Sequence, residues 1–143
     1  MKNLITLIIS SSLLFILTIP ALAEQLEYPA NQGKSFTSED KFYKQLKKEY
    51  REFEDATYSI RRKISYKETP DALMTFEEKT GRYFGQPKQK LAPNIHPERQ
   101  VYFLASFIQS RDKEYLKFEI IDAETKQSLA RGNSSHSYIN PYK

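Results

Sequence analysis

The stretch RQVYFLASFIQS, from Arg99 to Ser110, constrains the fold of this chain more than any other part of the sequence. Its apolar side chains occupy both sets of alternating positions. One set holds Val101, Phe103, Ala105 and Phe107, and the other holds Tyr102, Leu104 and Ile108. Apolar residues in both sets are typical of a strand that is buried on both of its faces. We therefore predict a doubly buried strand over this stretch.

The sequence EYLKFEIIDAETKQSLARG follows after a short polar turn, and its first half alternates between apolar and charged residues. Leu116, Phe118 and Ile120 occupy one set of positions and are predicted to face the core. Lys117 and Glu119 lie between them, so we expect their side chains to point into solvent.

Two polar turns, RDKE and DAETK, divide this C-terminal region into three consecutive strands. Consecutive strands that are joined by short turns form an antiparallel meander. The last residues, NSSHSYINPYK, either extend into a fourth strand or form a tail.

Residues 37–56, TSEDKFYKQLKKEYREFEDA, have the features of a helix. Thr37 or Ser38 can cap its start, and the two acidic residues that follow complement the helix dipole. Apolar residues then recur at spacings of three and four, which places them on one helical face. These residues are Tyr43, Leu46, Tyr50 and Phe53.

A second, shorter helix is predicted from about Pro70 to Thr80. Thr69 can cap it, a proline suits its first position, and Gly81 can end it. A hairpin that turns at EKTG is the alternative. The following residues, GQPKQKLAPNIHPE, contain three prolines and predict a long surface loop.

Residues 57–67, TYSIRRKISYK, fit either a strand or a continuation of the first helix. Their β-branched and aromatic composition favours the strand, although Ile60 and Ile64 also continue the helical spacing. The whole pattern predicts an α+β fold, with one or two helices packed on a small antiparallel sheet of three to five strands.

Residues 1–23 have the pattern of a secretory signal peptide. A basic start at Lys2 precedes an uncharged apolar stretch, and the motif ALA ends at Ala23. A membrane anchor is the alternative, because the apolar stretch is nearly long enough to span a bilayer. Pro20 and the charged Glu24 favour cleavage near Ala23. We therefore expect an exported protein, periplasmic or secreted, with no stable membrane insertion after cleavage.

Cleavage would leave a flexible arm at residues 24–36 and a single α+β domain at residues 37–143. The formal net charge of +4 falls by one when Lys2 is removed. So small a surplus does not predict nucleic-acid binding. The chain has no cysteine, which excludes disulfides and thiol chemistry.

Histidine, the residue most often used for acid–base catalysis, is scarce in this chain. The only histidines are His96 and His136, and a pair of histidines can cleave a phosphodiester by acid–base chemistry. A small phosphodiesterase-like or ribonuclease-like hydrolase is therefore one hypothesis. Nothing in their spacing brings the two together, so a non-enzymatic protein is favoured. Two histidines without cysteine do not predict a zinc site, and no sequence motif predicts a cofactor.

Basic and aromatic residues occur close together in two segments: RRK lies among aromatic residues, and RYFGQPKQK contains both kinds. Such mixtures can bind anionic polymers or stack on sugars, so we predict a binding surface there. Its residues are Arg61, Arg62, Lys63, Arg82, Tyr83, Phe84, Lys88 and Lys90. The predicted partner is an anionic envelope polymer or another exported protein. In the second case this chain would be an inhibitor or immunity-type protein. The alternative is a strand edge on which the cations only discourage aggregation.

Overall fold

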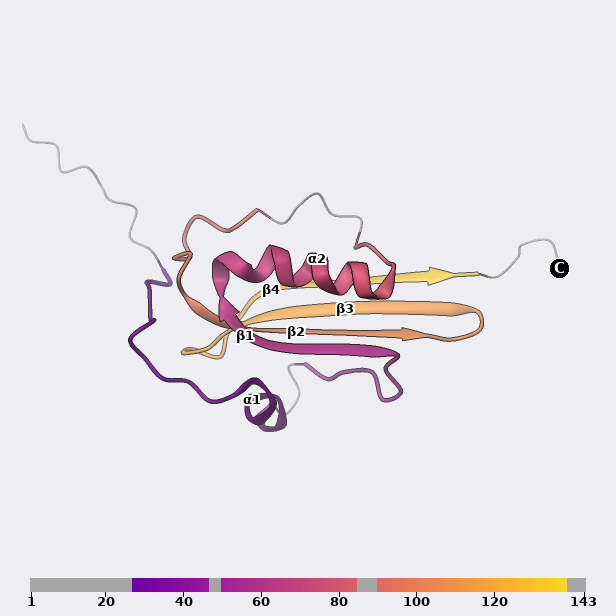
Figure 1. Cartoon of the computed structure of the whole chain (residues 1–143), viewed down its shortest axis with the longest axis horizontal. Helices are drawn as coiled ribbons and strands as arrows, with labels where there is room; N and C mark the ends of the chain where they lie inside the picture. Colours follow the sequence, from indigo (N-terminus) through magenta and orange to yellow (C-terminus); the bar gives the residue numbers. More distant parts are fainter. Residues whose placement is uncertain (1–26, 47–49, 85–89, 139–143) are drawn as a thin grey trace, which may run out of the picture.

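The computed structural model describes residues 27–46, 50–84 and 90–138. Within these ranges, two α-helices and one short 3-10 helix accompany four strands in a single antiparallel sheet (Figure 1). The elements in chain order are α1 Glu39–Gln45, β1 Tyr58–Ser65, η1 Tyr66–Glu68, α2 Thr69–Thr80, β2 Gln100–Gln109, β3 Lys113–Asp122 and β4 Ser128–Ser137. The predicted α+β class and the C-terminal meander of β2, β3 and β4 are confirmed.

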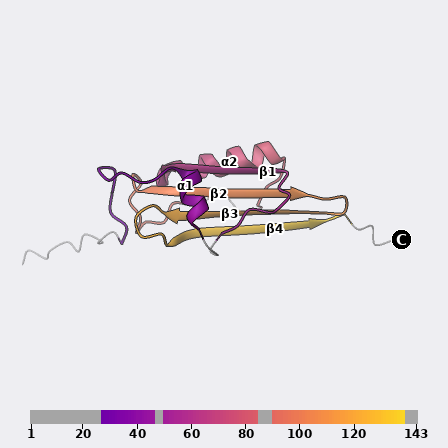
Figure 2. The same ribbon diagram turned by 90° about the horizontal axis from the view of Figure 1, so that it is seen from below.

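Strand β2 lies inside the sheet, because the strand order is β1-β2-β3-β4. Each face of the sheet carries a different cover, so the sheet lies between two layers (Figures 1 and 2). We call these the α2 face and the α1 face, after the helix on each. Val101 and Phe103 pack on the α2 face, whereas Tyr102 and Leu104 pack on the α1 face. All four side chains are fully buried, which confirms the doubly buried strand.

Helix α2 has residues at both ends that favour the start and the end of a helix. Pro70 occupies its first turn, and Gly81 ends it in the left-handed region with φ of 65°. The helix starts one residue earlier than predicted, at Thr69, whose hydroxyl donates to the carbonyl of Tyr66 at 2.8 Å instead of accepting from the helix. The preceding turn is closed by a capping box between Ser65 and Glu68.

Strand β1 settles the ambiguous segment at residues 57–67 in favour of the strand. It pairs with β2 from Tyr58 opposite Phe107 to Ser65 opposite Gln100. Packing explains this outcome, because Tyr58, Ile60 and Ile64 all join the core of the α2 face.

The prediction of a long first helix is wrong beyond its first two turns. Helix α1 ends at Gln45, and Leu46 already has an extended backbone with ψ of 117°. Residues 50–53 have no helical structure. Residues 50–53 instead lie on the α1 face of the sheet, where the amide of Phe53 donates to Ser106 Oγ at 3.1 Å. Residues 47–49 lie outside the described ranges.

The prediction that Lys117 and Glu119 point into solvent is also wrong. Glu119 is only 5% exposed, and the Lys117 ammonium lies 4.0 Å from the centroid of the Phe53 ring. Burial lowers the pKa of Lys117. As the alternation in β3 predicts, Lys117 and Glu119 lie on the opposite face from Phe118. That face is not exposed to solvent, because the segment around Phe53 covers it.

Strand β4 includes half of the predicted tail, since it continues to Ser137. Its register shifts between Ile120 opposite Ala130 and Ile121 opposite Ser128, so Leu129 is an extra residue in a β-bulge. Residues 139–143 lie outside the described ranges, as does the predicted signal peptide at residues 1–23. Among the described residues, no helix combines the length and apolarity needed to cross a membrane.

Part of the predicted N-terminal arm contacts one end of the sheet. Arg99 forms two hydrogen bonds with Asp122, at 2.6 and 2.9 Å, and donates a third to the carbonyl of Pro29 at 2.8 Å. Both charged side chains are buried. Burial raises the pKa of Asp122, but the Arg99 guanidinium and the Thr125 amide more than offset this and hold it below its usual 3.8.

Candidate binding groove

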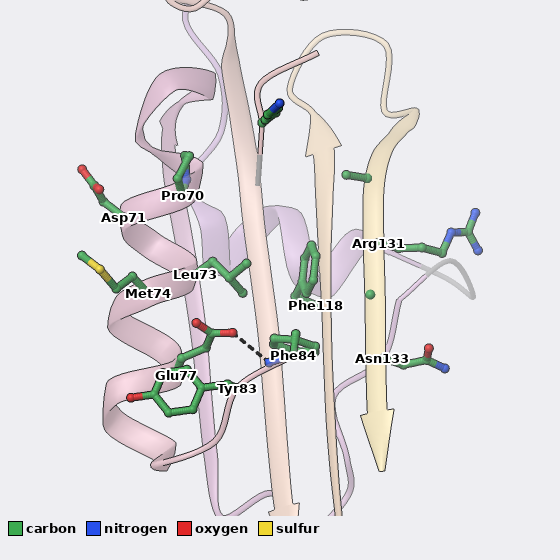
Figure 3. Close-up of a pocket in the computed structure, with 13 residues that line it drawn as sticks. Pro70, Asp71, Leu73, Met74, Glu77, Tyr83, Phe84, Phe118, Arg131 and Asn133 are labelled. Atoms are coloured by element: carbon green, nitrogen blue, oxygen red, sulfur yellow. Dashed lines mark hydrogen bonds between the residues drawn. The ribbon is translucent and has the colours of Figure 1, made fainter. Parts of the chain in front are cut away.

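A groove exists on the α2 face because one helix is too narrow to cover four strands. Helix α2 packs on β1 and β2. A helix is about 10 Å wide and strands lie about 4.8 Å apart, so one helix covers about two of them. The face of β3 and β4 beside it is hollowed into a groove of about 710 Å³ (Figure 3).

The floor of this groove is aromatic. The Phe84 ring lies edge-on to the Phe118 ring at 5.0 Å and beside the Phe76 ring at 6.3 Å. The Phe84 amide donates to Glu77 Oε1 at 2.8 Å, which fixes the chain as it leaves α2. Immediately before Phe84 in the chain, Tyr83 is 69% exposed and stands at the rim.

The two walls differ in chemistry. Leu73 and Glu77 project from α2 toward the groove (Figure 3), and Met74 lines its outer rim. On β4, the side chains of Arg131 and Asn133 point away from it, so that wall consists of main chain and small residues (Figure 3).

Gly132 allows the floor to reach β4. A Cβ atom at this position would lie 2.3 Å from Phe118 Cε1, well inside van der Waals contact. Only glycine therefore lets the Phe118 ring lie against this strand without displacement.

A polar cluster occupies the end of the groove near the C-terminus of α2, in a second hollow of about 440 Å³. Glu114 is only 3% exposed there and accepts from Arg82 Nε at 2.6 Å and from the Tyr138 hydroxyl at 2.5 Å. The His136 ring lies edge-on to Tyr138, with centroids 5.0 Å apart. Burial raises the pKa of Glu114, but the bonds from Tyr138 and Arg82 outweigh it and lower the pKa.

The two predicted basic segments have different locations. Arg82, Tyr83, Phe84 and Lys90 all line the groove or its polar end. Lys88 lies outside the described ranges. The structure therefore brings together every described residue of the second segment.

The first segment, Arg61 to Lys63, is not part of this groove. Arg61 pairs with Glu52 through two bonds of 2.6 and 2.8 Å, and its guanidinium lies 3.8 Å from the centroid of the Tyr43 ring. The hydrogen bonds that Arg61 donates to Glu52 raise the pKa of Arg61. Arg62 and Lys63 are exposed, and Lys63 donates to the carbonyl of Phe36 at 3.0 Å.

The two histidines are not brought together. His136 is a residue of β4, near its C-terminal end, and pairs with Glu114 of β3. His96 precedes β2 and bonds through its amide to the Tyr28 carbonyl at 2.9 Å. These are opposite ends of a sheet whose central strand has ten residues, or roughly 30 Å at the rise of a strand.

Sequence reasoning missed Met74, Phe118, Gly132 and Glu114 as residues of the site. A lone glycine within a strand pattern signals a close approach, so Gly132 could have been identified. Glu114 gave no signal, because its role depends on Arg82, which is distant in the sequence.

Within the described ranges, no group of three histidine, aspartate or glutamate side chains could hold a metal ion. Comparison of the chain with protein-family models, with curated proteins and with solved structures finds no match. The groove and its polar end are therefore the basis for any functional conclusion.

Proposed function

We propose that this chain is an exported, non-enzymatic binding protein whose groove between α2 and β4 takes a segment of another exported protein. The observation that carries this proposal is the aromatic floor of Phe84 and Phe118 beside the exposed Tyr83. A concave apolar site with a few polar groups at its rim is the usual form of a binding site.

The charges around the groove favour a polypeptide over an anionic polymer. Lys90 lines it, but so do Asp71 and Glu77 on the wall of α2. The cations at Arg61 and Arg62 lie elsewhere on the sheet and do not extend a basic surface into it. A polyanion is held by a run of cations, whereas a polypeptide can supply apolar side chains and charges of both signs.

The export of the protein is proposed on the N-terminal sequence, in which a basic start, an apolar stretch and the ALA motif precede Glu24. Mass spectrometry of the exported chain is expected to find Glu24 as its first residue. An inhibitor or immunity-type protein would be one form of such a binder. The separation of His96 from His136 gives no support to a hydrolase that uses both.

Peptide selection tests the proposed function directly. The exported chain would be immobilised and used to select from a displayed library of random peptides. We expect enrichment of sequences that carry two or more apolar or aromatic residues, because these can fill the floor at Phe84 and Phe118. Soluble dextran sulfate should not displace them at physiological salt.

Two matched variants of α2 give the control. Met74→Gln removes an apolar side chain from the wall of the groove, whereas Lys79→Gln changes an exposed residue of the same helix that does not line it. Selected peptides should bind the Lys79→Gln protein normally and the Met74→Gln protein at least about tenfold more weakly. Equal binding to both variants, or enrichment that dextran sulfate abolishes, would refute the proposal.

A further inference from the structure

The two edge strands of the sheet are protected to different degrees. Strand β1 carries three consecutive cations, Arg61 to Lys63, of the kind that discourages edge-to-edge pairing. Strand β4 contains neither lysine nor proline, and Arg131 is its only permanently charged residue. No described strand pairs with its outer side. It is ten residues long, so it offers a full-length template to another strand.

The free main-chain groups of β4 can be assigned from the ladder. The Tyr138 amide donates to the carbonyl of Asp112 at 2.8 Å, one position beyond the pairing of Ser137 with Lys113. Hydrogen-bonded and non-hydrogen-bonded pairs alternate along an antiparallel ladder. Every second residue back from Tyr138 therefore bonds to β3. The residues between them direct their amide and carbonyl groups outward; they include Arg131, Asn133 and Ser135.

The apolar groove is accessible from this edge because the residues of β4 on the α2 face are small. They are Ala130, Gly132 and Ser134, opposite Ile120, Phe118 and Leu116. The Phe118 ring lies against Gly132, where no side chain separates it from the edge. A large side chain on a strand added beside β4 would thus contact the aromatic floor across Gly132.

The geometry points to strand addition: an extended segment of the partner pairs with the outer edge of β4 as a fifth strand. This inference rests on the proposed function and specifies how its partner is held. Main-chain hydrogen bonds supply affinity in such complexes, and alternate side chains supply specificity. Here the side chains on the α2 face would be apolar, over Gly132 and Phe118.

Charge specifies the other face of the added strand. Arg131 is exposed and makes no ion pair with any described residue, and it lies opposite Glu119 on the α1 face. An acidic side chain on the partner would meet it there. A second copy of this chain fits less well, because β4 paired with β4 adds a second arginine and no carboxylate. The preferred partner segment therefore alternates apolar and acidic residues.

Amide hydrogen exchange tests this arrangement with a defined probe. The probe is an acetylated ten-residue peptide in which valine alternates with glutamate or threonine, and the control is a peptide of the same composition in which valines are adjacent. We expect the alternating peptide, at saturation, to slow exchange at Arg131, Asn133 and Ser135 by about tenfold or more. Ala130 and Gly132, already bonded to β3, should change less.

Single N-methylation of the probe sharpens the test. In an antiparallel fifth strand, residues whose side chains lie on the α1 face direct their N–H groups at β4, so a methyl on a central glutamate should weaken binding by about tenfold or more. The N–H of a central valine points away from β4, and its methylation should have little effect.

The outcomes separate this inference from the proposed function. If library-selected peptides depend on Met74 but no bound peptide slows exchange at the three amides, strand addition is wrong and the groove remains the binding site. Equal effects of the two N-methylations would also overturn it. If the chain alone dimerises in sedimentation experiments and protects these amides without peptide, the occupant is a second copy and the proposed partner is wrong.

Discussion

The two faces of the sheet are covered in different ways. The α2 face is packed with apolar and aromatic side chains, and the Phe103 and Phe118 rings stack at its centre with centroids 6.2 Å apart. The α1 face has fewer apolar residues, and three of its cations lie over aromatic rings. Arg61 lies over Tyr43, Lys117 over Phe53 and Lys126 over Phe42, at 3.8, 4.0 and 4.9 Å from the ring centroids.

This difference follows from what each cover is made of. Helix α2 is a regular element with an apolar face, so it excludes water from β1 and β2. The cover of the α1 face is a short helix followed by extended chain, which leaves polar groups in partly buried places. The Tyr50 hydroxyl is buried there without a hydrogen-bond partner among the described residues, and burial raises its pKa. A cation that lies over an aromatic ring stabilises the fold less than apolar side chains that are packed together away from water.

The largest effect is expected from Phe103→Ala on the α2 face. Phe103 is fully buried between α2 and the sheet, so truncation leaves a cavity and should lower the free energy of unfolding by about 3–5 kcal/mol. Denaturant unfolding measures this change. A loss below about 1 kcal/mol would mean that this face is not the main core.

A smaller loss is expected when the α2 face is overpacked. Gly132→Ala places a methyl group inside the space of the Phe118 ring, which must move, at a cost of about 1–3 kcal/mol. The same change should weaken peptide binding, because the displaced ring alters the floor of the groove. Gly33→Ala is the matched control, since a Cβ atom there meets no other atom within 4 Å. Equal stability of the two variants would contradict the close approach.

On the α1 face, we expect Lys117→Ala to lower the free energy of unfolding by a modest amount. The Lys117 ammonium lies over the face of the Phe53 ring, so we expect a loss of about 1 kcal/mol in the free energy of unfolding. Lys117→Met keeps the stem and should lose less than the alanine variant. A change within about 0.5 kcal/mol for Lys117→Ala would restore the solvent-facing lysine that the alternation in β3 predicts.

The smallest effect is a pH dependence of stability that arises from two lysines on the α1 face. Burial lowers the pKa of both Lys117 and Lys126 below the ordinary 10.5. Between the lowered values and 10.5 each of these lysines binds more protons in the unfolded chain than in the folded one, so its contribution to stability should rise with pH in this window. The unmodified chain should therefore gain stability relative to the double variant Lys117→Met, Lys126→Met as the pH rises through this window. Identical pH profiles would show that burial does not perturb these lysines.

Strands β2, β3 and β4 could be predicted from the sequence because each carries its own evidence, whereas the segment of β1 also fitted a helix. The run from Val101 to Phe107 is apolar in both sets of positions, which only a doubly covered strand explains. The meander followed from its short turns. The first helix could not be delimited, because the spacing of Leu46, Tyr50 and Phe53 is the same whether those side chains pack from a helix or from a chain that crosses the sheet.

The candidate site was predicted in part. Tyr83, Phe84 and Lys90 were identified from the mixture of basic and aromatic residues, and all three line the groove. The similar mixture at Arg61 gave the same signal, although Arg61 bonds to Glu52 on the other face. Local composition cannot distinguish these cases, because the difference lies in whether a carboxylate from elsewhere in the chain neutralises the cation.

The sequence by itself determined the α+β class, the doubly buried strand, the order of the meander and the end of α2 at Gly81, because periodicity, turns and caps act over a few residues. Only the tertiary structure decided which face of β3 is covered, which cations are paired and where the sheet is left open. Those features depend on contacts between distant segments: Phe53 over Lys117, Glu52 on Arg61, and one helix too narrow to cover β3 and β4.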